Sequence, residues 1–294
     1  MAHIAFKGCG TALLTPFKNG GKEVDYDAVG RLVDRQVEAG VHFLVPLGTT
    51  GETPCLTEVE RLKILQITKD HSKGRPILVG GGTNSLAQTI SNIKDLEPFG
   101  PDAFLIVVPY YNKPTQKGLF EYFKAVAEST DKDIVLYNVP GRTGANIEAE
   151  TTIRLAEEVP NIVAVKEASG RYAQISQIIR NRPEGFSVLS GNDDETLSLM
   201  ATGADGVISV ASNVDPVRMV ALVEALEKDD MKTARKLHYK LMPLFKNCFI
   251  ESNPIPAKAA LAQLGLMENS LRLPLFPATE TTEAVIKETL AELF

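Results

Sequence analysis

Short runs of apolar residues recur along the chain, and each run ends near a glycine, a proline, an asparagine or a charged residue. Most of the runs are continuous rather than alternating, as at residues 105–108 and 162–165. Continuous β-branched runs are typical of strands that are buried on both faces, and such strands form parallel sheets. We therefore predict eight parallel strands, over residues 8–17, 42–48, 76–82, 103–109, 133–140, 162–168, 186–192 and 205–210.

The segments between these runs have helical spacing. Capping signals precede several of them: Asp25, a capping box at Thr57 with Glu60, a second box at Ser85 with Gln88, and Asp215 before a proline. A strand followed by a helix, repeated eight times within about 225 residues, predicts a (β/α)₈ TIM barrel of the α/β class.

The alternative fold is a doubly wound parallel sheet, which usually carries a glycine-rich nucleotide loop after its first strand. Here Gly8 and Gly10 are followed by Leu13 where the third glycine belongs, and no phosphate-binding GxxxxGK[ST] motif occurs. These absences favour the barrel.

Beyond residue 226 only helical spacing remains, over residues 231–249, 256–264 and 279–293, and prolines separate the three segments. We expect a barrel domain that carries the chemistry over residues 1–225. Residues 226–294 are expected to form a helical extension that packs on the barrel and is not an independent domain.

Composition narrows the range of partners. The chain has 294 residues, is 44% hydrophobic and 23% charged, and has a formal net charge of −6, which argues against non-specific nucleic-acid binding. The three cysteines are scattered and no paired Cys/His spacing occurs, so neither a disulfide framework nor a zinc site is expected. The first residues do not resemble a signal peptide, and no apolar run approaches the length of a membrane span, which makes a cytoplasmic location the expectation.

In a barrel of this kind the active site lies at the carboxyl ends of the strands. Lys166 follows four apolar strand residues, where desolvation of its ammonium group is costly. Desolvation and a nearby cation such as Arg142 would create a nucleophilic amine. The alternative is a structural lysine that reaches solvent or pairs with Glu167, although strand alternation places Glu167 on the opposite face.

Other strand ends carry further candidates. Thr49 and Thr50, between Gly48 and Gly51, suit a turn that binds an anion, although the same sequence also suits a plain turn. Tyr137 suits either a proton-transfer role or the core, and Arg142 suits either a carboxylate or a surface ion pair.

The four histidines fall near the terminus, at a strand start or in helical segments, and none is a strong candidate for a site. Adjacent Asp193 and Asp194 are more typical of a helix cap than of a metal site.

Residues 48–52, residues 137–144 and Lys166 together resemble the Schiff-base-forming lyases, a superfamily that includes the dihydrodipicolinate synthases and the N-acetylneuraminate lyases. Residues 110–114 and 253–258 are also similar to the synthases, so that the resemblance covers essentially the whole chain. Arg142 and Tyr111 favour the synthase family over the sialic-acid lyases.

The resemblance implies that Lys166 forms an imine with pyruvate and that aspartate semialdehyde is the second substrate. It implies a proton relay of Tyr137, Thr49 and Tyr111, in which Tyr111 comes from a neighbouring subunit of a dimer or tetramer. It assigns the remaining substrate-binding positions to Thr50, Arg142, Gly191 and Ile208. No metal or organic cofactor is expected, because the imine itself accepts the electrons.

A lysine-inhibition site in this family resembles the region of Asn84, Gln88 and Tyr110. Asn84 and Tyr110 match, whereas Gln88 stands where a glutamate usually binds the amino groups of lysine, and Glu58 and Arg61 replace histidines. We therefore expect weak or absent feedback by lysine. Two other functions stay open at this point: a different pyruvate-dependent aldolase on the same scaffold, and a catalytically silent ligand-binding protein.

Overall fold

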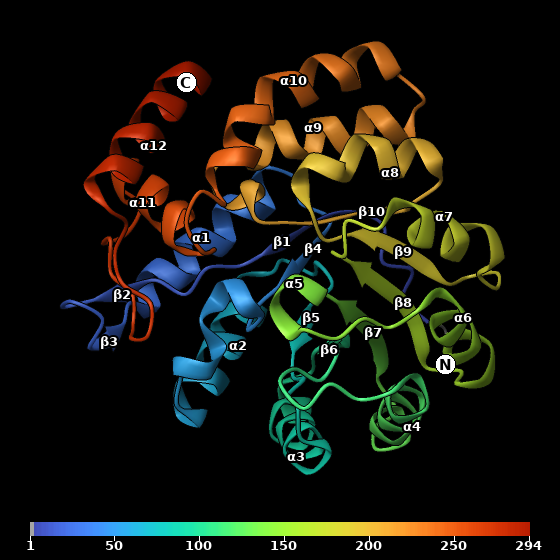
Figure 1. Ribbon diagram of the computed structural model, residues 1–294. Helices are drawn as coiled ribbons and strands as arrows, with labels where there is room; N and C mark the ends of the chain where they lie inside the picture. The colour runs from blue at the N-terminus through green and yellow to red at the C-terminus, as the bar shows by residue number, and fades with distance from the viewer. Residues whose placement is uncertain (1–2) are drawn as a thin grey trace.

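The computed structural model describes residues 3–294 and contains an eight-stranded parallel barrel surrounded by helices (Figure 1). Hydrogen-bonded neighbours follow the order β4-β1-β10-β9-β8-β7-β6-β5, and a parallel bridge between Leu44 and Ile77 joins the two ends of this order. The TIM barrel prediction is confirmed. The strands are β1 Gly8–Ala12, β4 Phe43–Val45, β5 Leu78–Gly80, β6 Ala103–Val107, β7 Asp133–Asn138, β8 Ile162–Glu167, β9 Ser187–Ser190 and β10 Gly206–Ser209.

The strand register fixes which residues are neighbours at the carboxyl end of the barrel. Tyr137 on β7 pairs with Lys166 on β8, and the next pair is Asn138 with Glu167. Because successive side chains of a strand point to opposite faces, Tyr137 and Lys166 share one face and Asn138 and Glu167 share the other. Tyr137 belongs to the apolar cluster inside the barrel, together with Leu189 and Ile208.

The helices around the barrel begin at capping side chains. Asp25 caps α1 and Asp215 caps α9, and the Thr57 box is complete because Thr57 and Glu60 bond reciprocally. The second predicted box forms only in half: Ser85 accepts the backbone N–H of Gln88, while the Gln88 amide donates to Asn92 instead. The helices are α1 Tyr26–Glu38, α2 Glu58–His71, α3 Leu86–Leu96, α4 Gln116–Ala127, α5 Pro140–Thr143, α6 Ala149–Glu158, α7 Tyr172–Asn181, α8 Thr196–Thr202 and α9 Pro216–Glu227.

The strand predicted over residues 8–17 was too long. β1 ends at Ala12, and Phe17–Lys18 (β2) instead pairs antiparallel with Glu23–Val24 (β3) in a small hairpin. Gly20 and Gly21 have positive φ values of 65° and 88°, which a tight turn between two-residue strands requires.

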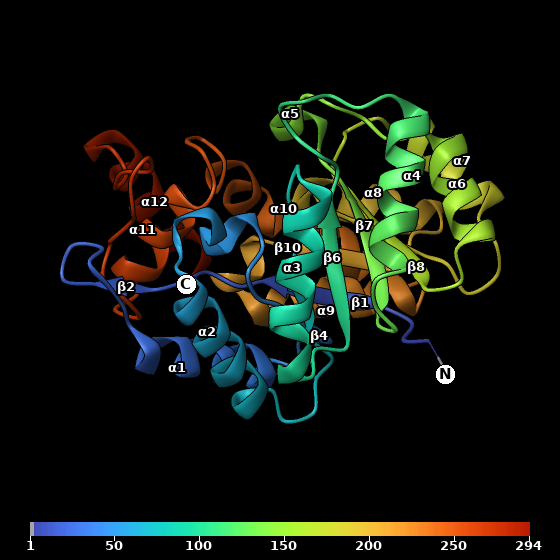
Figure 2. The same cartoon turned by 90° about the horizontal axis from the view of Figure 1, so that it is seen from below.

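Three further helices follow α9: α10 Met231–Asn247, α11 Ile255–Gln263 and α12 Glu280–Leu293. One buried apolar cluster combines residues of β1 and α9 with residues of all three, including Leu244, Ala260 and Ile286. Both views place α11 and α12 next to the end of the barrel that carries the β2–β3 hairpin (Figures 1 and 2). The division at residue 225 stays a prediction. The predicted boundary falls inside α9, which continues to Glu227.

Within residues 3–294, none of the helices combines the length and the apolar character needed to cross a lipid bilayer.

Candidate active site

Lys166 is buried at the end of β8, with only 6% of its surface exposed. Its Nζ lies 4.3 Å from the centre of the Tyr137 ring. No ion pair joins it to a carboxylate among the residues that the structure describes. The site therefore holds an amine against an aromatic ring without a counter-ion.

Glu167 does not serve as the partner of Lys166. Its carboxylate, on the opposite face of β8, accepts hydrogen bonds from the Asn138 amide and, at 2.5 Å, from the Ser169 hydroxyl. Burial raises the pKa of Glu167, and the bonds from Ser169 and Asn138 oppose that shift. The structural alternative of a Lys166–Glu167 pair is thus excluded.

Gly191, directly after β9, brings the backbone next to Lys166. A Cβ atom at position 191 would lie 3.0 Å from Cε of Lys166 and 2.7 Å from Cβ of Ala168. Ile208 on β10 is fully buried in the same interior cluster as Tyr137. The predicted positions Gly191 and Ile208 therefore lie with Lys166 and Tyr137 at the barrel interior.

The two threonines lie in a 3₁₀ turn, Thr49–Gly51, that follows β4. Thr49 is exposed, whereas Thr50 is buried and its hydroxyl accepts a 2.9 Å hydrogen bond from the Asn253 amide. Leu47, two residues before the turn, and Glu52, directly after it, have φ values of 58° and 51°. Non-glycine residues in the left-handed region cost on the order of 1–3 kcal/mol each, so the surrounding contacts must hold the turn in place.

A cavity of about 320 Å³ contains some of the predicted groups, whereas Lys166, Thr50, Gly191 and Ile208 are not among its lining residues. Thr49, Tyr137 and Arg142 line it, and so do Arg61 and Tyr110 from the region that resembles the lysine-inhibition site. A larger surface groove of about 960 Å³ lies between α6 and α7 and contains none of the predicted site residues. The groove is more open to solvent and contains no predicted site residue, which makes the smaller cavity the better candidate.

Arg142 lies on α5 and is exposed to this cavity. Its Nη2 donates a 3.3 Å hydrogen bond to the backbone oxygen of Asn253. The guanidinium is therefore oriented by a neutral carbonyl, which leaves its charge available for an anion.

Tyr111 is not brought to the cavity by its own chain. Its side chain is 89% exposed and its φ is 73°. Between described residues no hydrogen bond links the phenol of Tyr137 with the hydroxyl of Thr49 or the phenol of Tyr111, so one chain alone does not complete the predicted relay. The assignment of these residues to a relay stays a prediction.

Two residues of the region that resembles the lysine-inhibition site, Gln88 and Arg61, contact Asn92. The Gln88 amide donates to Asn92 Oδ1 at 3.0 Å, and Arg61 Nη1 donates to the same oxygen at 3.1 Å. The Asn84 carbonyl accepts from Asn112, and Tyr110 is 38% exposed. Weak feedback by lysine stays a prediction.

Sequence reasoning missed the role of Asp193. It was expected to be a cap, but its Oδ2 accepts from the backbone N–H groups of Val210 and Ala211, at 3.1 and 3.0 Å. Asp193 thereby fixes the loop after β10, and burial raises its pKa. No local pattern in the sequence signals this contact. Asn253 was noted only for the resemblance, although it touches both Thr50 and Arg142.

Comparison with known proteins identifies the family of the chain. The model of the dihydrodipicolinate synthetase family matches residues 5–293. The chain belongs to this family. A 4-hydroxy-tetrahydrodipicolinate synthase of Thermotoga neapolitana is 47% identical over 98% of both chains.

Solved structures of the family superpose closely on the chain. The dihydrodipicolinate synthase of Thermotoga maritima has a TM-score of 0.96 at 46% identity and covers 99% of both chains. A monomeric dihydrodipicolinate synthase variant also has a TM-score of 0.96 at 46% identity, and covers 98% of this chain and 97% of its own. The barrel and the C-terminal helices are therefore both part of the family architecture.

Proposed function

We propose that this chain condenses pyruvate with L-aspartate 4-semialdehyde, through an imine on Lys166, to give 4-hydroxy-tetrahydrodipicolinate for lysine and diaminopimelate biosynthesis. The observation that carries the mechanism is the buried amine of Lys166, which lies against Tyr137 and beside the bare backbone of Gly191. Family membership and full-length relatives that carry the synthase name support the activity. The reaction class is that of a lyase.

The proposed reaction proceeds through imine formation, carbon–carbon bond formation and ring closure. Nζ of Lys166 attacks the ketone carbon of pyruvate, and loss of water from the adduct gives the imine. A proton then leaves the methyl group, and the resulting enamine carbon bonds to the aldehyde carbon of the second substrate. The amino group of that substrate displaces Lys166 from the imine, which closes the ring and frees the enzyme.

Each neighbouring side chain has a group suited to one of these steps. Tyr137 places a phenol beside the reacting amine, where water departs and protons move. The Thr50 hydroxyl accepts from Asn253, so its own proton is free to bind the pyruvate carboxylate. Arg142 binds the carboxylate of the semialdehyde, and Gly191 and Ile208 shape the pyruvate pocket.

We also propose that the active form is a homo-oligomer, a dimer or a dimer of dimers. The support is the incomplete relay of Tyr137 and Thr49 within one chain, together with the side chain of Tyr111, which is 89% exposed and so accessible to a second copy. A second copy would supply Tyr111 to the relay. A biosynthetic role on two small metabolites fits a cytoplasmic location.

Borohydride reduction in the presence of pyruvate tests the mechanism. We expect a pyruvyl adduct on Lys166, located by peptide mass mapping, and no adduct when pyruvate is omitted. The Lys166→Ala variant should lose both the adduct and the condensation of aspartate semialdehyde. Native protein without the adduct, or a fully active Lys166→Ala protein, would contradict the proposal.

A further inference from the structure

The C-terminal segment Asn253–Lys258 touches the catalytic face of the barrel at three points, although the two lie far apart in the sequence. The Asn253 amide donates to Thr50, and its carbonyl accepts from Arg142. Lys258 forms an ion pair with Glu52, with 2.5 Å between Nζ and Oε1. The same short segment therefore contacts the threonine turn, the residue that ends it and the cationic group across the cavity.

Glu52 joins this segment to the threonine turn. It follows Gly51 directly, with a left-handed φ of 51°, and its side chain is 0% exposed. Oε1 faces Lys258, and Oε2 accepts the backbone N–H of Arg272 at 3.1 Å. A strained residue whose two carboxylate oxygens are both held by the C-terminal region fixes the end of the turn.

Lys258 has further buried contacts besides its pair with Glu52. It lies on α11 and is fully buried, and its Nζ also donates to the Ser270 carbonyl at 3.0 Å and lies 4.1 Å from the centre of the Phe17 ring. Removing one partner of a buried pair leaves an uncompensated charge, whereas replacing both by apolar groups is often neutral. Stability alone therefore does not account for an ion pair at this place.

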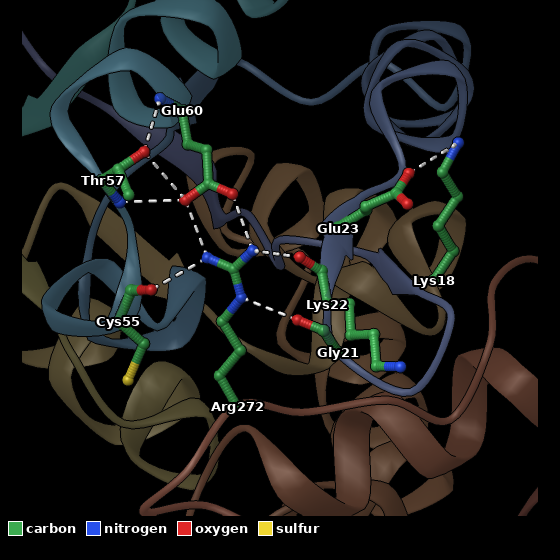
Figure 3. Close-up of polar contacts among 8 residues, drawn as sticks. All are labelled: Lys18, Gly21, Lys22, Glu23, Cys55, Thr57, Glu60 and Arg272. Carbon is green, nitrogen blue, oxygen red and sulfur yellow. Dashed lines mark hydrogen bonds and ion pairs between the residues drawn. The ribbon is translucent and has the colours of Figure 1, made fainter.

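A second ion pair nearby provides an internal comparison. The Arg272 guanidinium binds both oxygens of Glu60, at 2.6 and 2.7 Å, and donates to the carbonyls of Gly21, Lys22 and Cys55 (Figure 3). It ties the β2–β3 hairpin to α2. Glu60, unlike Glu52, does not adjoin the threonine turn.

We propose that Lys258 is a positioning residue, which acts through Glu52 to hold the Thr49–Gly51 turn in the geometry that binds the carboxylate of the 2-oxo acid. The inference rests on the proposed function, since it assigns that carboxylate to the turn. The C-terminal extension thus forms part of the substrate site without touching substrate.

The test measures how adduct formation depends on pyruvate concentration. Wild-type protein and the Glu52→Gln, Lys258→Met and Glu60→Gln variants are trapped with borohydride over a range of pyruvate concentrations, and the half-saturating concentration is compared with the melting temperature. For Glu52→Gln and Lys258→Met we expect that concentration to rise roughly tenfold, the effect of losing one hydrogen bond to a charged group, while the adduct yield at saturation is retained. Glu60→Gln should lower the melting temperature and leave the half-saturating concentration unchanged.

The double variant Glu52→Gln/Lys258→Met covers the case in which a single variant does not fold, because it leaves no unpaired charge. We expect it to regain melting temperature and still require more pyruvate than wild type. The proposal would be overturned if folded variants had the half-saturating pyruvate concentration of wild type. It would also be overturned if that concentration changed in step with the melting temperature in all variants, Glu60→Gln included. An absent adduct in wild type would instead refute the proposed function.

Discussion

The chemistry proposed for Lys166 rests on its position and not on a charged partner. A strand end buries the amine, Tyr137 lies beside it in the neighbouring strand, and Gly191 leaves room for a planar carbon next to its chain. A side chain at position 191 would occupy the space next to Cε of Lys166. The absence of a Cβ atom there is therefore as much a part of the site as the amine.

The Arg142→Gln variant tests whether the carboxylates of the two substrates are bound by different residues. Arg142 lines the cavity but does not belong to the threonine turn, so its loss should raise the KM for aspartate semialdehyde by roughly tenfold or more. The pyruvate dependence of borohydride trapping should stay as in wild type. Steady-state kinetics with each substrate varied in turn measures both effects. An equal rise in both KM values would contradict separate binding of the carboxylates.

The placement of Lys166 and Tyr137 at neighbouring strand ends could be predicted because each follows an apolar run, and the carboxyl ends of the strands carry the active site in barrels of this kind. Asn253 and Asp193 could not be predicted in this way. Asn253 reaches Thr50 across 203 positions of sequence, and Asp193 bonds to the backbone of a different loop. Contacts of this kind depend on packing, which no local pattern encodes.

At the scale of elements, one arginine joins three parts of the chain that contain none of the predicted catalytic residues. Arg272 joins the loop before α12 to the β2–β3 hairpin and to the first turn of α2, where Glu60 also completes the capping box (Figure 3). The hydrogen bonds from Arg272 lower the pKa of Glu60 to about 2. A carboxyl group whose pKa is lowered by folding stabilises the folded state at pH values above its pKa in the unfolded chain. This stabilisation is lost as the pH falls toward the pKa in the folded state.

The Glu60→Gln variant should therefore be less stable than wild type at pH 7, by about 1–2 kcal/mol for a bidentate charged contact. The difference in unfolding free energy should stay constant down to about pH 5 and shrink as the pH falls from 4.5 toward about 2. Urea unfolding of both proteins at a series of pH values measures it. A difference that is independent of pH over this range would show that the ionised carboxylate does not carry the effect.

Element boundaries were predictable where a capping side chain marks them, as at Asp25, Thr57 and Asp215. The β2–β3 hairpin was missed because each of its strands has two residues, too few for any periodicity to appear. The box at Ser85 looked complete in sequence, but Gln88 bonds to Asn92 on the same helix face, four residues further along. Tertiary and same-face partners compete for a side chain that a local motif assigns to the cap.

At the scale of the molecule, the exposed Tyr111 predicts that sites are shared between copies of the chain. Tyr111→Phe and Lys166→Ala subunits, each impaired alone, should regain activity when they are mixed. A mixed dimer would hold one complete site, so random exchange should restore about a quarter of wild-type activity. Assays before and after refolding of the mixture measure the gain. The proposal of shared sites would be contradicted if a mixture were no more active than the separate variants. Size-exclusion chromatography must show in that case that both variants are oligomeric.

The overall architecture was predictable because the strands of a parallel barrel have continuous apolar sequences and alternate along the chain with helices that begin at capping residues. The C-terminal helices were predictable as an extension, but their contribution to the site was not. Only the folded chain brings Lys258 to Glu52 and Asn253 to Thr50.

These last contacts give the growing chain an order of events. A ribosome completes Lys166, Tyr137 and every barrel strand before it adds Asn253 and Lys258. Until then Glu52 lacks the counter-charge of Lys258, and Thr50 lacks its hydrogen bond from Asn253, although Thr15 already bonds to the Gly51 carbonyl. If the proposed role of Lys258 is correct, a chain that lacks this segment would carry the Lys166 amine but bind the 2-oxo acid poorly, so that full substrate binding depends on the last part of the polypeptide.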